Sequence, residues 1–393
     1  MKDKTNKPIA KAIFVFPSHF MAGIYLHIPF CKQACHYCNF HFSTSLRHQA
    51  ALVRALMKEI ELQKDYLQRQ PIETIYFGGG TPSLLTPDEL TSLLATIRQQ
   101  HWYNTQAEVT LEINPENITP QHCQQWQQAG INRLSIGVQS FLDDELRWMN
   151  RSHTAGQSLQ GLQTAQQFFD NISIDLIYGL PQQSDQQWQA NVEQAIALGI
   201  PHLSCYALTV EPKTALEKKI RNKDYHPVEP DKQSEQFMLL MNWLEKAGYR
   251  HYEISNFSKP NLESRHNSAY WQGAHYLGIG PSAHSYNGVS RQWNVSNNAL
   301  YIQSLEQSQL PFEVEVLTPV QQQNEYLMTA LRTDTGIDLA KISLDKPRIL
   351  QTAARYIDSG HLQIDHNRLW LSKEGKLLAD GIAAALFAED RVA

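Results

Sequence analysis

The segment Ile24 to Phe42, IYLHIPFCKQACHYCNFHF, decides the fold and the chemistry expected of this chain. It holds three cysteines in the spacing C-x3-C-x2-C, at Cys31, Cys35 and Cys38. Soft thiolates select zinc, copper(I) or an iron–sulfur cluster, and ordinary iron–sulfur clusters are held by four cysteines. Three thiolates would therefore hold a [4Fe-4S] cluster and leave its fourth iron open to a small ligand.

The alternative for this segment is a structural zinc site of the Cys3His kind, with His27, His36 or His41 as the fourth ligand. Zinc sites more often pair two short C-x2-C units across a longer loop, and the chain has no second unit. The other two cysteines, Cys123 and Cys205, stand alone among apolar residues and are expected to be buried small side chains. The spacing favours the cluster.

The composition is that of an ordinary soluble globular chain. It has 393 residues, of which 42% are hydrophobic and 19% charged, enough for two domains with sizeable cores. A formal charge of -5 argues against a nucleic-acid partner. Five cysteines, three of them in one segment, do not suit a disulfide framework, which predicts a reducing, cytoplasmic setting. The early apolar run at residues 12–16 is too short for a membrane span, so residues 1–20 are expected to be a loose tail of a protein that is not integral to a membrane.

Short β-branched and aromatic runs alternate with stretches of helical period, which predicts an α/β fold with a parallel sheet and crossover helices. The six expected strands are residues 24–28, 74–77, 108–113, 133–136, 172–177 and 202–207. The expected helices include residues 47–67, 158–169, 186–198 and 233–247. Ligands of such folds bind where the carboxyl ends of the strands meet, so functional residues are expected directly after strands.

Polar residues and glycines do stand at these positions. A glycine-rich turn, Gly78-Gly79-Gly80-Thr81-Pro82, follows the second strand and lets the backbone approach a ligand. It lacks the Lys and the spacing of a phosphate-binding loop. Glu112, Gln139 and Asp175 stand at or near the ends of the third, fourth and fifth strands, and Arg151 lies twelve residues after Gln139. One charged residue there is more often a surface ion-pair partner, but four favour a ligand site.

Longer motifs surround these residues. They are YLHIPFCKQACHYCNF at 25–40, FGGGTP at 77–82, LEINPEN at 111–117, LSIGVQSF at 134–141, MNR at 149–151, DLIYGLP at 175–181, YEISNF at 252–257 and HNSAYW at 266–271. On these motifs, nearly everything after residue 22 resembles radical S-adenosylmethionine proteins of the coproporphyrinogen dehydrogenase group, in particular their HemW-type haem chaperone branch. The resemblance implies a partial (β/α)6 barrel whose three cysteines hold a [4Fe-4S] cluster. The amino and carboxylate groups of S-adenosylmethionine would chelate the fourth iron.

The family pattern also implies roles for individual residues. Tyr25 matches the residue beside the cluster and the methionine moiety, and Gly79, Gly80 and Thr81 match the turn that receives the methionine amino group. Tyr37 and Asn39 flank Cys38 and are expected close to the cluster, while Ala207 ends the sixth strand on the adenine side.

Glu112, Gln139, Arg151 and Asp175 fall where the family holds the carboxylate and the ribose hydroxyls. Carboxylates accept hydrogen bonds from hydroxyls and an ammonium group, and a guanidinium suits a carboxylate through paired donors.

Two features separate the branches of the group. The coproporphyrinogen-oxidising enzymes carry a further cysteine one residue after the third ligand, where this chain has Phe40, as the haem chaperone branch does. HNSAYW resembles the HN-x-x-YW signature of that branch, which implies that His266, Asn267, Tyr270 and Trp271 handle haem. Imidazole is a common haem ligand and aromatic rings can cover a porphyrin face. The same residues could instead cap and pack a turn, and His251, His275 and His284 compete as ligands.

The last part of the chain, residues 301–393, is expected to form a small helical, winged-helix-like domain after a barrel with an accessory segment at residues 21–300. From residue 318 onward it carries nine Lys and Arg against ten Asp and Glu, a poor match to a phosphate backbone. Packing against the barrel, or a protein partner, is the better expectation.

Three functions follow from these patterns. The first is a haem chaperone with no catalytic residue of its own, which passes haem to an acceptor haemoprotein such as a membrane-bound respiratory component. The second is oxygen-independent coproporphyrinogen III dehydrogenase, which the missing fourth cysteine argues against. The third is a radical enzyme acting on another substrate, because a fold does not fix a function.

Overall fold

A computed structural model describes residues 21–389 and contains the parallel sheet that the sequence predicts. Its six strands are β1 (Ala22–Ile28), β2 (Ile72–Gly79), β3 (Tyr103–Ile113), β4 (Arg133–Gln139), β5 (Ile172–Tyr178) and β6 (His202–Ala207). Each pairs in parallel with the next in chain order. All six expected strands are confirmed, with ends that differ by at most a few residues. The predicted tail at residues 1–20 lies outside the described residues.

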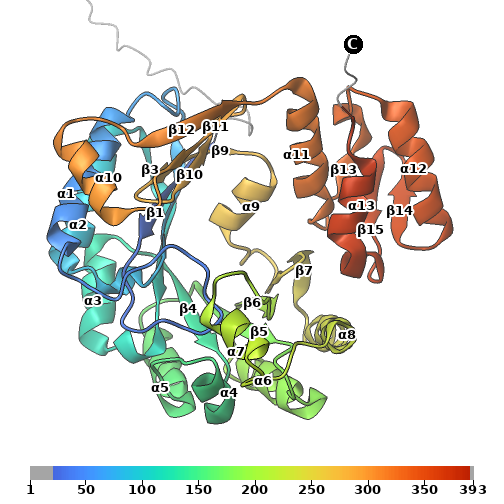
Figure 1. Ribbon diagram of the computed structural model, residues 1–393, viewed down its shortest axis with the longest axis horizontal. Coiled ribbons are helices and arrows are strands. Elements are labelled where there is room, and N and C mark those ends of the chain that lie inside the picture. The colour runs from blue at the N-terminus through green and yellow to red at the C-terminus, as the bar shows by residue number, and fades with distance from the viewer. Residues whose placement is uncertain (1–20, 390–393) are drawn as a thin grey trace, which may run out of the picture.

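Helices follow these strands, and the longer ones cover the outer face of the curved sheet (Figure 1). The helices are α1 (Gln49–Leu62), α2 (Pro87–Gln100), α3 (Pro120–Ala129), α4 (Asp143–Trp148), α5 (Ala155–Ala165), α6 (Asp185–Ala197), α7 (Ala215–Arg221) and α8 (Pro230–Lys246), with the short 3-10 turns η1 (Pro82–Leu84) and η2 (Pro115–Asn117). Capping boxes begin α2 at Thr86, α5 at Thr154 and α6 at Ser184, where each side chain accepts the N3 amide. The expected helix at residues 47–67 ends earlier, at Leu62.

The inner face of the sheet starts at β1. Alternate residues of a strand point to opposite faces. Ile24, Leu26 and Ile28 are fully buried in the main core, whereas Gly23, Tyr25 and His27 line an internal cavity. The two predicted lone cysteines are buried in the same core, Cys123 in α3 and Cys205 in β6.

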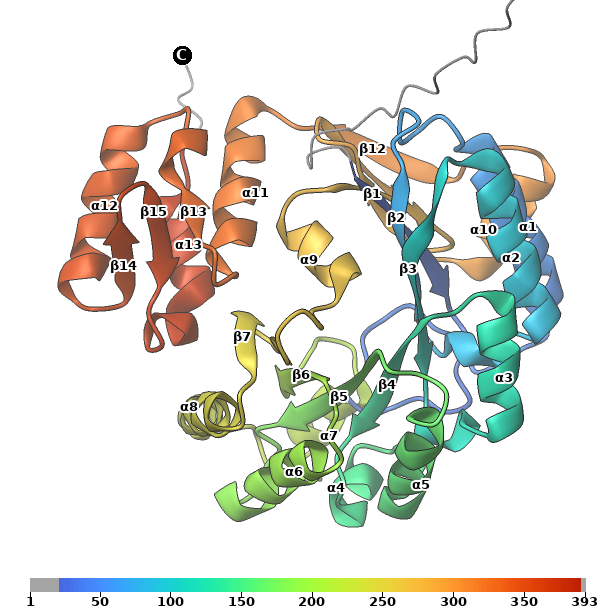
Figure 2. The ribbon, with the colours of Figure 1, turned by 180° about the vertical axis from the view of Figure 1, so that it is seen from behind.

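Further strands extend both edges of the sheet. Beside β1 lie β9 (His275–Ile279), β10 (His284–Tyr286), β11 (Ser290–Asn294) and β12 (Phe312–Val316), and beside β6 lie β8 (Asn256–Ser258) and β7 (Arg250–Glu253). Only β9 of these is parallel to its neighbour in the central sheet. Because β1 and β6 pair with these added strands and not with each other, the barrel stays open. The short helix α9 (Arg265–Trp271) lies between the sheet and the C-terminal elements in both views (Figures 1 and 2).

The C-terminal elements form a second core. They are α11 (Pro319–Leu331), β13 (Ile337–Asp338), η3 (Leu339–Lys341), α12 (Lys346–Asp358), β14 (Leu362–Asp365), β15 (Arg368–Leu371), η4 (Gly375–Leu378) and α13 (Ala379–Leu386). Their strands pair in the order β13-β15-β14, and Leu327, Ile349, Leu369 and Ile382 are among the residues of this core. Three helices and a hairpin match the small winged-helix-like domain that was expected.

The second core begins later than residue 301. Helix α10 (Asn298–Glu306) buries Tyr301, Ile302 and Leu305 in the main core, and β12 extends the main sheet to Val316. Residues 301–317 still belong to the barrel, so the boundary between the main core and the second core lies between β12 and α11.

The C-terminal domain is fastened to the edge of the barrel. The Ile254 amide donates to the Arg332 carbonyl at 3.1 Å, and the Asp334 amide donates to the Tyr252 carbonyl at 3.1 Å. The Arg250 guanidinium bonds the Asp334 carboxylate at 2.6 and 3.0 Å. Among the described helices, none is both long and apolar enough to cross a membrane.

Candidate functional site

The three cysteines lie in the loop between β1 and α1, at the carboxyl end of β1. The Cys31 amide donates to the Ser43 carbonyl at 3.0 Å, which closes the loop on itself. The His36 amide donates to the Met149 carbonyl at 3.1 Å and ties the loop to α4. All three thiols are half-buried. Burial raises the pKa of Cys31 to about 11, so thiolates here need a nearby cation such as iron.

Each histidine proposed as a fourth zinc ligand holds one ring nitrogen in a hydrogen bond. A ring nitrogen of His27 bonds the His41 carbonyl at 2.9 Å, one of His36 bonds the Trp148 carbonyl at 2.8 Å, and one of His41 bonds Asn298 at 2.7 Å. Within residues 21–389, no three His, Cys, Asp or Glu side chains are grouped to hold one metal ion. A cubane distributes its thiolates over different irons, so the spacing argument for a cluster does not need such a group.

The glycine turn packs tightly against the start of the cysteine loop. The Gly80 amide donates to the Ile28 carbonyl at 2.9 Å, and the Thr81 amide donates to the Phe30 carbonyl at 2.6 Å. A Cβ on Gly80 would lie 2.6 Å from the Phe30 oxygen, so a side chain does not fit. The amide of Gly79 donates to Glu112 at 3.0 Å. With these amides occupied, the turn suits a ligand amino group, which donates, better than an anion.

Two carboxylates lie inside the barrel, Glu112 near the end of β3 and Asp175 within β5, and β4 lies between these two strands. Glu112 accepts a hydrogen bond from the Tyr76 hydroxyl at 2.8 Å. Burial, and then the nearby Asp175 charge, raise the pKa of Glu112 to about 7. Burial raises the pKa of Asp175 to about 6, against an opposing hydrogen bond from Ser204. Two partly buried carboxylates that repel each other form a suitable environment for a ligand with hydroxyl groups and a positive charge.

Arg151 links these strand ends to the cysteine loop. Its Nη2 atom donates to Asn114 and to the Gly137 carbonyl, both at 2.8 Å, and Nη1 lies 3.3 Å from the Cys35 sulfur. Its buried Nε atom has no partner in the described structure. A Cβ on Gly137 would lie 3.2 Å from Arg151 Nη2 and 3.0 Å from the Gln139 amide nitrogen, so glycine leaves room for both. An unpaired guanidinium donor fits a ligand carboxylate.

The remaining predicted residues lie around this centre. Tyr25 stacks on Tyr76 with ring centroids 6.1 Å apart, and Tyr37 packs against the apolar cluster that contains Leu146 and lies close to Arg151. Asn39 is exposed at the end of the loop. Ala207 is half-buried and packs against the main core, as an ordinary core residue would.

Replacing Glu112 with Gln is expected to change how stability depends on pH. A carboxyl group whose pKa is raised by folding from its ordinary 4.5 to about 7 stabilises the fold when protonated, and this contribution is lost as pH rises through about 7. The Gln variant cannot ionise. Thermal unfolding of the ligand-free protein should therefore show a smaller fall in Tm over that rise in pH in the variant. An unchanged pH dependence would contradict the raised pKa.

A cavity of about 960 Å³ occupies the inside of the open barrel. It extends from Asn39, Phe40 and His41 at the cysteine loop, past Tyr25 on β1, to α9 and α11. Ligand sites in proteins commonly have volumes of roughly 300 to 1,000 Å³, so this cavity can hold a large organic molecule. Phe40 is 66% exposed at its edge.

Helix α9 presents His266 to this cavity. The Thr74 hydroxyl lies 2.8 Å from His266 Nδ1. The other ring nitrogen of His266, Nε2, forms no hydrogen bond with the described residues. Glu108 accepts the His266 amide at 3.1 Å, which fixes the start of the helix. Burial, together with the Arg133 charge, lowers the pKa of His266 to about 4. The imidazole is therefore neutral at pH 7, as a metal ligand must be.

Helical spacing divides the HNSAYW motif between two faces of α9. His266 and Tyr270 are four residues apart and both line the cavity, whereas Asn267 and Trp271 are not among its lining residues. The Asn267 amide donates to the Ser264 side chain that caps the helix. Trp271 lies under the Arg332 guanidinium, 5.1 Å from the ring centroid, and so contacts the C-terminal domain.

The competing histidines also separate. His275 and His284 line the cavity, as do His27 and His41. His251 does not, because its ring stacks on Phe257 with centroids 4.0 Å apart.

Sequence reasoning missed the far wall of the cavity. Tyr276, Tyr286 and Arg291 come from the edge strands, and Glu325 and Tyr326 come from α11. The concentration of His and Tyr at residues 275–286 was the available signal. These strands are too short for their alternation to stand out, and nothing local in α11 indicates which domain it faces.

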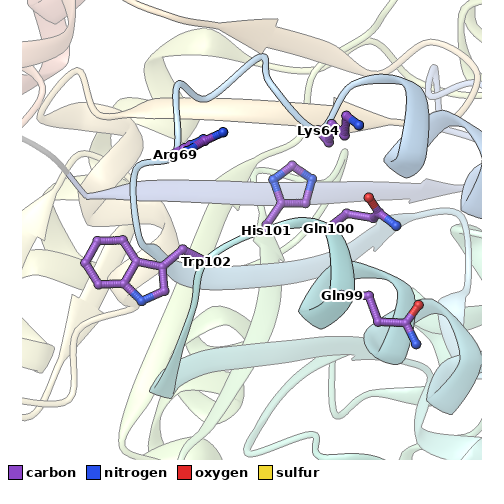
Figure 3. A pocket seen from close by; sticks show the side chains of 6 residues that line it. All are labelled: Lys64, Arg69, Gln99, Gln100, His101 and Trp102. Atoms are coloured by element: carbon purple, nitrogen blue, oxygen red, sulfur yellow. The ribbon is translucent and has the colours of Figure 1, made fainter.

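A second, smaller cavity of about 390 Å³ lies at the ends of α1 and α2 (Figure 3). Lys64, Arg69, Gln99, Gln100, His101 and Trp102 line it. None of the predicted site residues lies there, so it is separate from the candidate site.

Several known proteins are similar to this chain in sequence. The model of the radical SAM superfamily matches residues 25–195. The chain is 34% identical over 370 residues to a protein named heme chaperone HemW from Mycobacterium tuberculosis, with 93% of this chain and 94% of that protein covered. It is 31% identical over 381 residues to heme chaperone HemW from Bacillus subtilis, with 94% and 100% covered.

A solved structure shows the same fold. Coproporphyrinogen III oxidase (HemN) from Escherichia coli, a radical SAM enzyme, superposes with a TM-score of 0.81 over 93% of this chain and 90% of that one. The sequence identity is 23%, so the likeness concerns the fold alone.

Proposed function

Because the chain belongs to the HemW family of radical SAM proteins, we propose that it is a haem chaperone, which binds haem in the cavity between α9, the edge strands and α11. The observation that carries this proposal is the cavity itself. A neutral imidazole and several aromatic rings converge on one space large enough for a macrocycle. Haem would be its cargo, and an acceptor haemoprotein, such as a membrane-bound respiratory component, would receive it in a cytoplasmic setting.

The cysteine loop supports a second part of the proposal. Cys31, Cys35 and Cys38 would hold a [4Fe-4S] cluster, whose open iron would bind S-adenosylmethionine. The unpaired Arg151 Nε suits the carboxylate of that ligand, and the glycine turn, with its amides occupied, suits the amino group. Glu112 and Asp175 would accept hydrogen bonds from its hydroxyl groups. When bound, the cluster and S-adenosylmethionine would supply one-electron chemistry beside the cavity.

Position 40 favours haem carriage over porphyrinogen oxidation. The pattern of the porphyrinogen-oxidising branch has a cysteine at this position. This chain has Phe40, whose largely exposed phenyl ring lies at the edge of the cavity. An apolar ring can pack on a porphyrin face but cannot transfer a proton or an electron as a thiol can.

Replacing His266 with Ala is expected to weaken haem binding by about tenfold or more, because it removes a neutral imidazole that faces the cavity. Haem titration followed by absorbance measures this, and the Soret band should shift as the ligand set changes. The matched control is His48→Ala, which removes an exposed histidine at the start of α1. An unchanged affinity and spectrum in His266→Ala would remove His266 from the haem site.

A further inference from the structure

One ion pair spans the cavity between the barrel and the C-terminal domain. The guanidinium of Arg291 on β11 pairs with the carboxylate of Glu325 on α11. Of the described residues that line this cavity, Arg291 is the only Lys or Arg and Glu325 the only Asp or Glu. The two side chains are 36% and 18% exposed, so water still reaches the pair. The cavity therefore has one positive group, and its present partner belongs to the other domain.

Arg291 lies among polar and aromatic groups of the edge strands. Its charge contributes to lowering the pKa of His284 and opposes the burial that raises the pKa of Tyr286, so both lie close to it. In the antiparallel register, Arg291 stands opposite Glu315 of β12. Glu315 in turn accepts a hydrogen bond from the Gln321 amide of α11 at 3.0 Å. Two carboxylates thus share the neighbourhood of one guanidinium.

This charge arrangement favours a ligand carboxylate that replaces Glu325 beside Arg291 over one that binds in addition to Glu325. A ligand carboxylate that approached Arg291 would be the third negative group beside one positive group. Like charges at close range in a partly buried site repel, so the ligand is accommodated when Glu325 turns away to solvent. A guanidinium binds a carboxylate through two parallel hydrogen bonds, which suits a single partner at a time.

We propose that Arg291 binds a carboxylate group of the cavity ligand in exchange for Glu325. This inference rests on the proposed function, because haem carries two propionate groups. The exchange breaks the ion pair between β11 and α11 and so loosens the face of α11 that covers the cavity. The backbone contacts of Arg332 and Asp334 keep the domain attached to the barrel.

The test compares two probes and two variants of the full-length chain. The probes are iron protoporphyrin IX and its dimethyl ester, which lacks the free carboxylates. We expect Arg291→Gln to weaken binding of the diacid by about tenfold and to leave binding of the diester unchanged. We expect Glu325→Gln to strengthen binding of the diacid, because the competing carboxylate is gone, and again to leave the diester unchanged.

The controls are Arg54→Gln, an exposed arginine on α1, and Glu313→Gln, an exposed glutamate on β12. Thermal unfolding verifies that each variant is folded. Equal affinity of Arg291→Gln and the unaltered chain for the diacid would overturn this inference alone, as would weaker diacid binding by Glu325→Gln. Failure of the unaltered chain to bind either porphyrin would overturn the proposed function and this inference with it.

Discussion

Replacing Cys31, Cys35 and Cys38 together with Ala is expected to abolish assembly of the proposed iron–sulfur cluster. The unaltered chain is expected to take up about four irons and four sulfides per molecule on anaerobic reconstitution, and the triple variant almost none. The physical reason is that the three cysteines supply the only soft ligands in this loop, and iron–sulfur clusters are held by thiolates. Iron and sulfide analysis, with the visible absorbance of the cluster, measures the result.

The control for this variant is Cys123→Ala. Cys123 is fully buried in α3 within the main core, so its loss should leave the iron content unchanged. Zinc analysis after growth without reconstitution distinguishes the alternative. One zinc per chain with no iron uptake would contradict the cluster and restore the Cys3His hypothesis.

Replacing Arg151 with Ala is expected to weaken binding of S-adenosylmethionine by roughly 100-fold, which corresponds to about 2.8 kcal/mol. The side chain is partly buried, its buried Nε atom has no partner among the described residues, and its other donors contact Gly137, Asn114 and Cys35. Loss of a charge-assisted pair of hydrogen bonds has an effect of this size. The iron content of the reconstituted variant should stay close to that of the unaltered chain.

Equilibrium binding of S-adenosylmethionine to the reconstituted protein measures the effect. Arg147→Ala is the matched control, because Arg147 lies on the exposed face of α4 and pairs with Asp144. Arg151→Lys keeps the charge but not the planar pair of donors, so an intermediate affinity is expected. If Arg151→Ala binds the ligand like the unaltered chain while it keeps its cluster and its fold, Arg151 has no part in the site.

The central sheet could be predicted from sequence because its strands carry strong local signals. Residues 24–28 and 172–177 are short apolar runs bounded by polar turns, and the helices between them have a clear period. The edge strands β9 to β12 gave no such signal, since β10 has only three residues and β12 is mostly exposed. Their pairing depends on contacts distant in sequence, and this is why the expected domain boundary fell at residue 301, inside α10.

The candidate site divides in the same way. Residues near strand ends, such as Glu112, could be predicted because a parallel sheet brings the carboxyl ends of its strands to one edge. The sequence could not predict which residues of HNSAYW line the cavity. Only the packing of α9 decides that His266 faces the cavity and Trp271 faces Arg332. Arg291 and Glu325 come from different domains, and only the assembled fold brings them together.

The central claim is that this chain carries haem and does not oxidise a porphyrinogen. The most direct measurement is anaerobic reconstitution with iron and sulfide, followed by haem titration and by an assay for conversion of coproporphyrinogen III in the presence of S-adenosylmethionine. We expect saturable binding of about one haem per chain, through the cavity between α9, the edge strands and α11, and no protoporphyrinogen. Formation of protoporphyrinogen by a chain that does not bind haem would contradict the account.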